Sequence, residues 1–257
     1  MYAIKSSCLL QIVQSFSRAT FKFCILVQPI FYSLMMYMIY QGYSHEHIIS
    51  YVIIGSGLLS LWSSVCFSSA GDIQRERDMG TLELIMTSPV DFKVILFGKI
   101  IGNTLLGLIP LLISFIFITL FFKISFDVAH LELLILSLLL TVISFIPISL
   151  LIACCLTLSR QVRALMNCIE YPIYILCGIV FPIELLPVWT RVFSYILAPT
   201  WGAKLIRSSV FGIDSMQMFW MNVLSIVLVS AFYTIISLLL LKKIDKLTRI
   251  NATLGVH

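Results

Sequence analysis

The chain of 257 residues is 60% hydrophobic and only 11% charged, whereas soluble domains carry about 25% charged residues. This composition excludes an ordinary soluble enzyme and predicts a membrane protein. The formal net charge is +5, but the basic residues are scattered between apolar stretches, so we expect no nucleic-acid partner. The seven cysteines show no spacing typical of disulfides or of a zinc site.

A short segment with helical spacing precedes the first long apolar stretch. Its apolar residues recur on one face, and Lys5, Gln11, Gln14 and Arg18 occupy the other faces. This pattern predicts an N-terminal interfacial elbow helix that lies on the inner leaflet among membrane lipids. A polar lead-in to the first span is the alternative. The apolar residues are Leu9, Ile12, Val13 and Phe16.

Six apolar stretches approach or exceed the roughly 20 residues that a membrane-spanning helix needs. The long runs lack the alternation of barrel strands. We therefore predict an all-α membrane protein with six transmembrane helices in a single transmembrane domain over residues 1–257. The predicted spans cover residues of about 20–41, 48–70, 98–122, 132–158, 165–182 and 216–241.

The distribution of basic residues predicts the orientation. Six spans place both termini on one side, and Lys and Arg are retained preferentially on the cytoplasmic side. Of the 17 Lys and Arg residues, 13 fall on the side of the termini. We expect a multi-pass protein of the bacterial plasma membrane with both termini in the cytoplasm and no cleaved signal peptide.

The densest run of charge lies between the second and third predicted spans, over residues 72–92. Gly80 weakens a helix that continues out of the second span, and Pro89 ends any helix before Ser88. Between them we predict a short helix that suits docking in a groove of a cytoplasmic partner; a solvated loop is the alternative. Leu82, Ile85 and Met86 share one face of this helix, and Glu83 lies on another.

The stretch between the fifth and sixth spans is too apolar for a hydrated loop. Prolines divide it, and Trp189, Tyr195 and Trp201 suit a membrane interface. We predict a re-entrant outer hairpin of two short helices over residues 183–214, which caps the exit of a translocation path. A peripheral amphipathic loop is the alternative. The predicted outer gate comprises Phe181, Pro182, Pro187 and Trp189.

Five polar side chains fall in or near the predicted spans, where such groups are costly and usually face other helices or a cavity. Helix packing is the default interpretation of the four amides, and lining of a translocation path is the alternative. Glu170 is interpreted as a substrate contact, as a snorkelling carboxylate, or as a partner of Arg160 or Arg163. The five residues are Gln28, Asn103, Asn167, Glu170 and Asn222.

Two apparent ligand motifs carry no prediction. His45 and His47 flank Glu46 without a further ligand, so no metal site is predicted. The glycine spacing and the following Ser or Thr of a Walker loop are missing around Gly98 and Lys99. We therefore expect ATP to be bound by another polypeptide.

Two stretches carry distinctive motifs: the string RERDMGTLELIMTSPV, followed by Gly98 and Lys99, and the string YPIYILCGIVFPIELLPVWTRVFSYILAPTWGAKLIR from Tyr171. They resemble, respectively, the cytoplasmic signature and the fifth span with its outer segment in the membrane subunits of type 2 ATP-binding-cassette (ABC) exporters, the ABC-2 type transporter family. The resemblance implies a coupling helix that contacts an ATPase subunit through Glu76, Arg77, Asp78, Gly80, Thr81, Leu82, Glu83, Ile85, Met86, Ser88 and Pro89.

The resemblance also implies an activity and partners. The chain is expected to be a permease without an ATPase site, assembled with two cytoplasmic ABC ATPase subunits that bind ATP and Mg and with a second membrane subunit, identical or paralogous. It would export an amphiphilic substrate, such as a drug, peptide antibiotic, lipid or lipid-linked glycan, by alternating access. Two other classes stay open: an integral-membrane enzyme acting on a lipid, and a self-contained channel or secondary carrier.

Overall fold

The computed structural model describes residues 2–44, 48–122, 128–157, 162–213 and 215–251. Within these ranges 87% of the chain is helical and no strand occurs, so the all-α prediction is confirmed. The elements are α1 (Tyr2–Ser17), α2 (Ala19–Tyr40), the π-helix η1 (Ile48–Gly55), α4 (Ser56–Asp78), α5 (Thr81–Met86), α6 (Phe92–Phe121), α7 (Leu131–Thr157), α8 (Val162–Leu176), the 3₁₀-helix η2 (Ile183–Leu185), α9 (Val188–Ile196), α10 (Ala198–Phe211) and α11 (Met216–Asn251).

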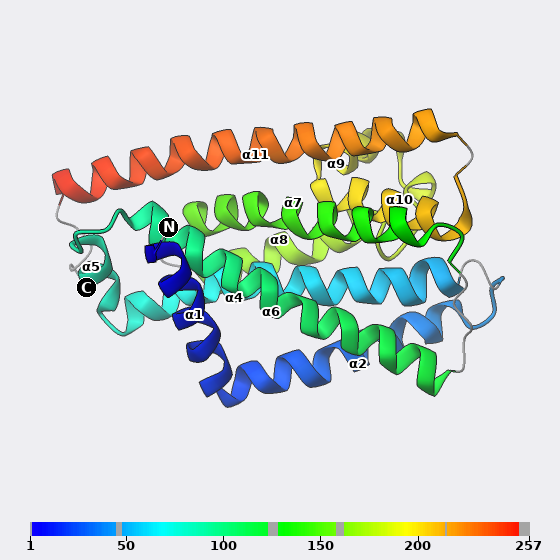
Figure 1. Ribbon diagram of the computed structural model, residues 1–257, viewed down its shortest axis with the longest axis horizontal. Coiled ribbons are helices and arrows are strands. Elements are labelled where there is room, and N and C mark those ends of the chain that lie inside the picture. Colours follow the sequence, from blue (N-terminus) through cyan, green and yellow to red (C-terminus); the bar gives the residue numbers. More distant parts are fainter. Residues whose placement is uncertain (1, 45–47, 123–127, 158–161, 214, 252–257) are drawn as a thin grey trace.

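The long helices run along the long axis of an elongated bundle (Figure 1). Among the described residues, five helical segments are long and apolar enough to cross a membrane. The first residues of α1, the short helix α5 and the last described turns of α11 lie at one end, whereas α10 lies in the half toward the other end. The five segments are Phe21–Tyr40, Tyr51–Asp78, Phe92–Phe121, Leu131–Cys155 and Met216–Ile244.

The predicted fifth span, 165–182, is wrong at its C-terminal end. Helix α8 stops at Leu176, and Gly178 adopts a φ of +66°, a left-handed conformation that interrupts the helical hydrogen bonds. A Cβ at Gly178 would also collide with Ile183. The 15 residues of α8 rise about 22 Å, which is short of a hydrocarbon core of about 30 Å.

Three other predicted spans are shorter than the helices that contain them. The helix of the second span continues to Asp78 rather than ending at residue 70, α6 begins at Phe92 rather than 98, and α11 continues to Asn251 rather than ending at residue 241. Apolar runs mark the part of a helix that contacts lipid, but backbone hydrogen bonding continues into charged sequence. The start of the predicted coupling segment, residues 72–78, therefore belongs to α4.

Helix α4 forms the centre of the bundle. It packs against α2, α6, α7 and α8, and its side chains Leu58, Leu61 and Trp62 are fully buried. Trp62 of α4 meets Phe145 of α7 edge to face, with 5.5 Å between the ring centroids. By contrast, α11 carries exposed Leu224, Leu228 and Leu239, as expected for a face in contact with lipid, whose tails are as apolar as Leu.

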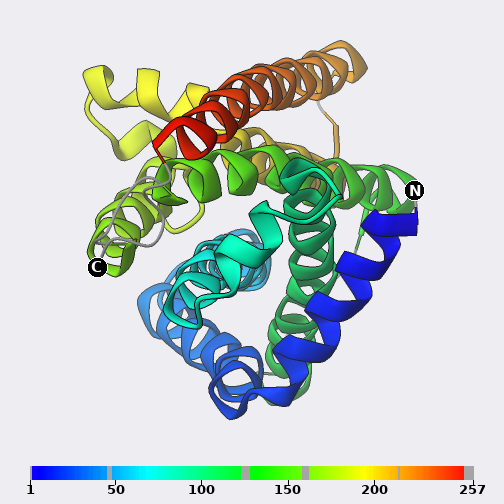
Figure 2. The same ribbon diagram turned by 90° about the vertical axis from the view of Figure 1, so that its left-hand side faces the viewer.

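Helix α1 crosses the bundle against α6 (Figure 2). The two helices approach closely because Gly98 and Gly102 have no side chain: a Cβ at Gly98 would lie 2.8 Å from the carbonyl oxygen of Ile4. Gln11 is buried against α6, whereas Leu9 and Val13 are 54% and 66% exposed. A helix forms where the sequence predicted one, and its apolar Leu9 and Val13 face outward.

Candidate functional site

A sharp corner joins α4 to α5 at one end of the bundle. Helix α4 ends with the backbone N–H groups of Met79 and Gly80 donating to the carbonyls of Arg75 and Arg77. Gly80 has a φ of +68°, the left-handed geometry that commonly follows a helix C-terminus and that favours glycine. The chain then turns sharply into α5 (Figure 1). A short helix therefore lies where the sequence predicted one.

An ion pair fixes this corner to α6. Lys99 of α6 donates to the carboxylate of Glu76, which also accepts a hydrogen bond from the hydroxyl of Thr81. The side chains of Lys99 and Glu76 are only 8% and 16% exposed. Glu76 and Thr81, which the resemblance implied as ATPase contacts, thus make contacts within the chain.

A buried carboxylate joins three helices beside this pair. Asp72 accepts hydrogen bonds from Gln11 of α1 and Asn103 of α6, and it forms ion pairs with Arg18 and Arg75. Partial burial lowers the pKa of the Arg18 guanidinium from its ordinary value, although an arginine stays protonated at neutral pH. Asn103 therefore serves in helix packing, which was the default interpretation of that residue.

The exposed surface of the corner differs from the predicted docking face. Ile85 is half-buried and, with Phe92 and Leu96, lines a small cavity between α4 and α6. Leu84 and Met79 are instead 70% and 68% exposed. Of the remaining predicted contacts, Gly80, Asp78 and Pro89 are exposed, and Arg77 and Ser88 are half-buried; the side chains of Leu82, Glu83 and Met86 lie outside the described part of the structure.

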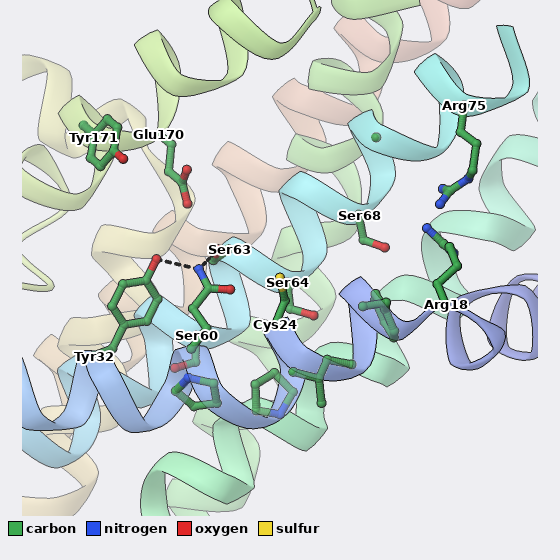
Figure 3. Close-up of a pocket in the computed structure, with 16 residues that line it drawn as sticks. Arg18, Cys24, Tyr32, Ser60, Ser63, Ser64, Ser68, Arg75, Glu170 and Tyr171 are labelled. Atoms are coloured by element: carbon green, nitrogen blue, oxygen red, sulfur yellow. Dashed lines mark hydrogen bonds between the residues drawn. The ribbon is translucent and has the colours of Figure 1, made fainter. Parts of the chain in front are cut away.

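A groove of about 390 Å³ lined by both polar and apolar side chains lies between α2, α4 and α8; it is named the polar groove after its serine, arginine and glutamate residues. Figure 3 shows Arg18 and Arg75 pointing toward one another at one end of it, with Glu170 and Tyr171 at the other. One stripe of α4 supplies most of the polar wall between these ends. This stripe consists of Ser60, Ser63, Ser64 and Ser68.

Two of the predicted polar residues, Gln28 and Glu170, take part in hydrogen bonds at the α8 end of the groove. Gln28 of α2 donates to the hydroxyls of Tyr32 at 2.8 Å and of Ser63 at 2.9 Å. The Tyr32 hydroxyl lies 3.4 Å from that of Tyr174, which donates to the carboxylate of Glu170. Glu170 is 5% exposed, so it lies inside the bundle at the groove rather than at a surface where it would snorkel.

The other predicted polar residues do not join the groove. Asn222 is half-buried on α11. The side chains of Asn167 and Arg163, together with Arg160, His45, Glu46 and His47, fall outside the described part of the structure. Among the described residues, no group of three His, Cys, Asp or Glu side chains is arranged to hold a metal ion.

The outer segment contains η2, α9 and α10 between α8 and α11. Of the predicted gate residues, Trp189 is 71% exposed and Phe181 is 37% exposed; Pro187 is exposed and Pro182 half-buried. Helix α10 packs against α7 and α11. There Arg207 lies 4.3 Å from the ring centroid of Tyr51 and donates to the carbonyl of Ile179 at 3.4 Å.

Sequence analysis missed several residues of these sites. Gln11, Asp72 and Asn103 were not identified as one network because they lie on three different helices. The serine stripe had a visible signal: Ser60, Ser64 and Ser68 recur every four residues, which places polar groups on one face of an otherwise apolar helix.

The five long apolar helices and the all-α architecture define a multi-pass membrane protein. A sequence model of the ABC-2 type transporter family matches residues 4–211. This match covers most of the chain, so the chain belongs to the ABC-2 type transporter family, whose members are the membrane permease components of ABC transporters rather than their catalytic domains. Comparison with curated proteins gives no match.

Proposed function

We propose that this permease works in an ATP-driven exporter with a separate ATPase. Two ABC ATPase subunits bind ATP and Mg, and a second membrane subunit, identical or paralogous, completes the translocation pathway. The observation that carries the proposal is the α4–α5 corner, which projects from one end of the bundle and exposes Met79 and Leu84. Single exposed apolar residues are common on protein surfaces, so this pair supports the proposal because it lies at the short helix where the family resemblance implies contact with the ATPase.

The corner is suited to transmit movement. The Glu76–Lys99 ion pair and the hydroxyl of Thr81 tie α5 to α4 and α6, so displacement of α5 by an ATPase moves both helices together. Alternating access would then open the polar groove beside α4 to one side of the membrane and afterwards to the other. The cargo is an amphiphile such as a drug, peptide antibiotic, lipid or lipid-linked glycan.

The proposed arrangement in the membrane places the α5 end in the cytoplasm. This assignment puts the first residues of α1 and the exposed Lys242 and Lys243 of α11 on the cytoplasmic side, as retention of basic residues requires. In addition to the five long segments, α8 together with the turn after it crosses the membrane, which makes six crossings in all. Helix α1 is the interfacial elbow, and α9 with α10 re-enters the outer leaflet.

Copurification tests the proposal. The full chain is expressed with the ABC ATPase encoded beside it, and Leu84→Glu is expected to abolish copurification and transport in vesicles because a charge is introduced at the contact. Glu83→Ala and Gly80→Ala are expected to weaken both. Leu131→Glu is the matched control, because Leu131 is 63% exposed at the start of α7, near the opposite end. Unaltered assembly and transport in the Leu84, Glu83 and Gly80 variants would remove the coupling role.

A further inference from the structure

The two ends of the polar groove differ in charge. At the end near α5, two guanidinium groups face one another (Figure 3), and the side chains of Arg18 and Arg75 are 26% and 27% exposed. They share one carboxylate, Asp72. Two positive charges and one negative charge leave a net charge of +1 at this end. The opposite end contains Glu170 and Tyr171.

Asp72 orients the two arginines without cancelling their charge. Its side chain is only 4% exposed and also accepts hydrogen bonds from Gln11 and Asn103. Arg18 also donates to the carbonyl of Gln14 and the hydroxyl of Ser15. Because each guanidinium has five N–H donors, donors remain on both arginines for a ligand. The planar donor fork of arginine matches phosphate and carboxylate groups. This end of the groove is therefore suited to an anionic group.

The stretch between the ends offers hydrogen bonds to a ligand. From Ser60 to Arg75 the α4 stripe extends about 22 Å. The Oγ atom of Ser64 is buried and has no hydrogen-bond partner among the described residues. An unpaired buried hydroxyl is costly, and Ser64 lies in the groove wall. A ligand with polar groups would supply the missing partner.

The end of the groove at Glu170 meets an apolar surface. Tyr171, which is 64% exposed, lines both the polar groove and a separate cleft between α8 and α9. That cleft is lined by Ile175, Trp189 and Phe193 among others. A molecule whose polar part occupies the groove therefore has an apolar surface beside it for its remaining part.

We propose that the groove takes an amphiphile with an anionic head, a phosphate or a carboxylate. Arg18 and Arg75 hold the head at the end near α5, the serines of α4 and Gln28 bond to its polar groups farther along, and the apolar part stays against α8 and the surrounding lipid. This inference rests on the proposed permease function and specifies the substrate class of the same site.

Binding to the purified full chain in detergent tests the headgroup. The probes are lysophosphatidylglycerol and lysophosphatidylcholine with the same acyl chain, and inorganic phosphate, with bound lipid counted by native mass spectrometry. We expect the anionic lysolipid to bind about tenfold more tightly than the zwitterionic one, as charge-assisted hydrogen bonds allow. Excess inorganic phosphate should not displace it, because phosphate lacks the apolar part. Equal affinities, or displacement by phosphate alone, would overturn the proposal.

Two variants in the groove and one control variant outside it locate the binding. Arg75→Gln should remove the preference for the anionic lysolipid, whereas Lys242→Gln, which removes an exposed cation near the same end, should leave it unchanged. Ser64→Phe should obstruct the groove and weaken binding of the anionic lysolipid, and it breaks no hydrogen bond to the described residues because the Ser64 Oγ has no partner among them. Unchanged binding in Ser64→Phe, or an equal loss in Lys242→Gln, would contradict the site.

The same preparations separate this inference from the proposed function. Copurification of the ATPase is measured beside lipid binding. Absence of headgroup preference with intact ATPase assembly refutes only the anionic ligand. Headgroup preference without any ATPase assembly refutes the ATP-driven permease and leaves the lipid-binding groove standing.

Discussion

Cations have different partners at the α4–α5 corner and in the outer segment. At the corner, Lys99 pairs with the Glu76 carboxylate. In the outer segment Arg207 lies over the ring of Tyr51 and donates to a carbonyl, and no ion pair is present for it among the described residues. Lys204 likewise lies 4.5 Å from the ring centroid of Tyr195.

The difference bears on how each region would move. Hydrogen-bonded ion pairs are directional and hold two helices in one relative position, which suits a corner that must transmit force. A cation over an aromatic face has a broader and weaker attraction, which suits a segment that shifts between arrangements. Substitutions at each cation test whether the contrast is real.

The largest effect is expected from Lys99→Met. This change leaves the buried Glu76 carboxylate without its cation and should lower the free energy of unfolding by about 3 kcal/mol. Chemical denaturation of the full chain in detergent measures the loss. The double variant Glu76→Gln with Lys99→Met should recover most of it, and Lys242→Met, at an exposed position, is the control. A single-variant loss no larger than the control's would refute the role of the pair.

The next effect is expected from Gly98→Ala, which places a methyl group 2.8 Å from the backbone of α1. Overpacking of this kind costs about 2 kcal/mol, and α1 should separate from α6. Chemical denaturation measures the loss of stability. Disulfide cross-linking between engineered cysteines on α1 and α6 measures the separation of the two helices. The matched control is Gly57→Ala on α4, where the nearest atom lies at an ordinary 3.7 Å; equal behaviour of the two variants would contradict the close approach.

A smaller effect is expected from Arg207→Met. The variant loses the contact with Tyr51 but orphans no carboxylate, and it removes an Nε atom that is buried without a hydrogen-bond partner among the described residues. The net loss should stay below about 1 kcal/mol, since hydrophobic replacement of buried charge is often close to neutral. A loss as large as that of Lys99→Met in the same denaturation assay would abolish the contrast between the two regions.

The smallest effect is expected from Lys204→Met. Its ammonium lies near the rings of Tyr195 and Trp201, an interaction worth about 0.5 kcal/mol when partly exposed. Lys243→Met, at an exposed position on α11, should have no measurable effect on unfolding. Equal free energies of unfolding for Lys204→Met and Lys243→Met would show that the ring contacts contribute nothing to stability.

The sequence predicted most of the helices but not their ends. Apolar runs identify stretches that avoid water, so α2, α4, α6, α7 and α11 were expected, whereas charged turns such as residues 72–78 were assigned outside the helix. The end of α8 was not predicted because the sequence contains no charged residue after Leu176 until Glu184. Only the conformation of Gly178 and its packing against Ile183 ended it.

By itself the sequence determined the membrane class, the helical architecture and a short helix after Gly80, because composition, run length and backbone preferences are local properties. Tertiary structure decided which polar residues meet. Gln11, Asp72 and Asn103 are separated by up to 92 positions in the chain and form one network only because Gly98 and Gly102 let α1 approach α6. The groove arises in the same way, because its arginines, serines and Glu170 come from separate segments that packing alone brings together.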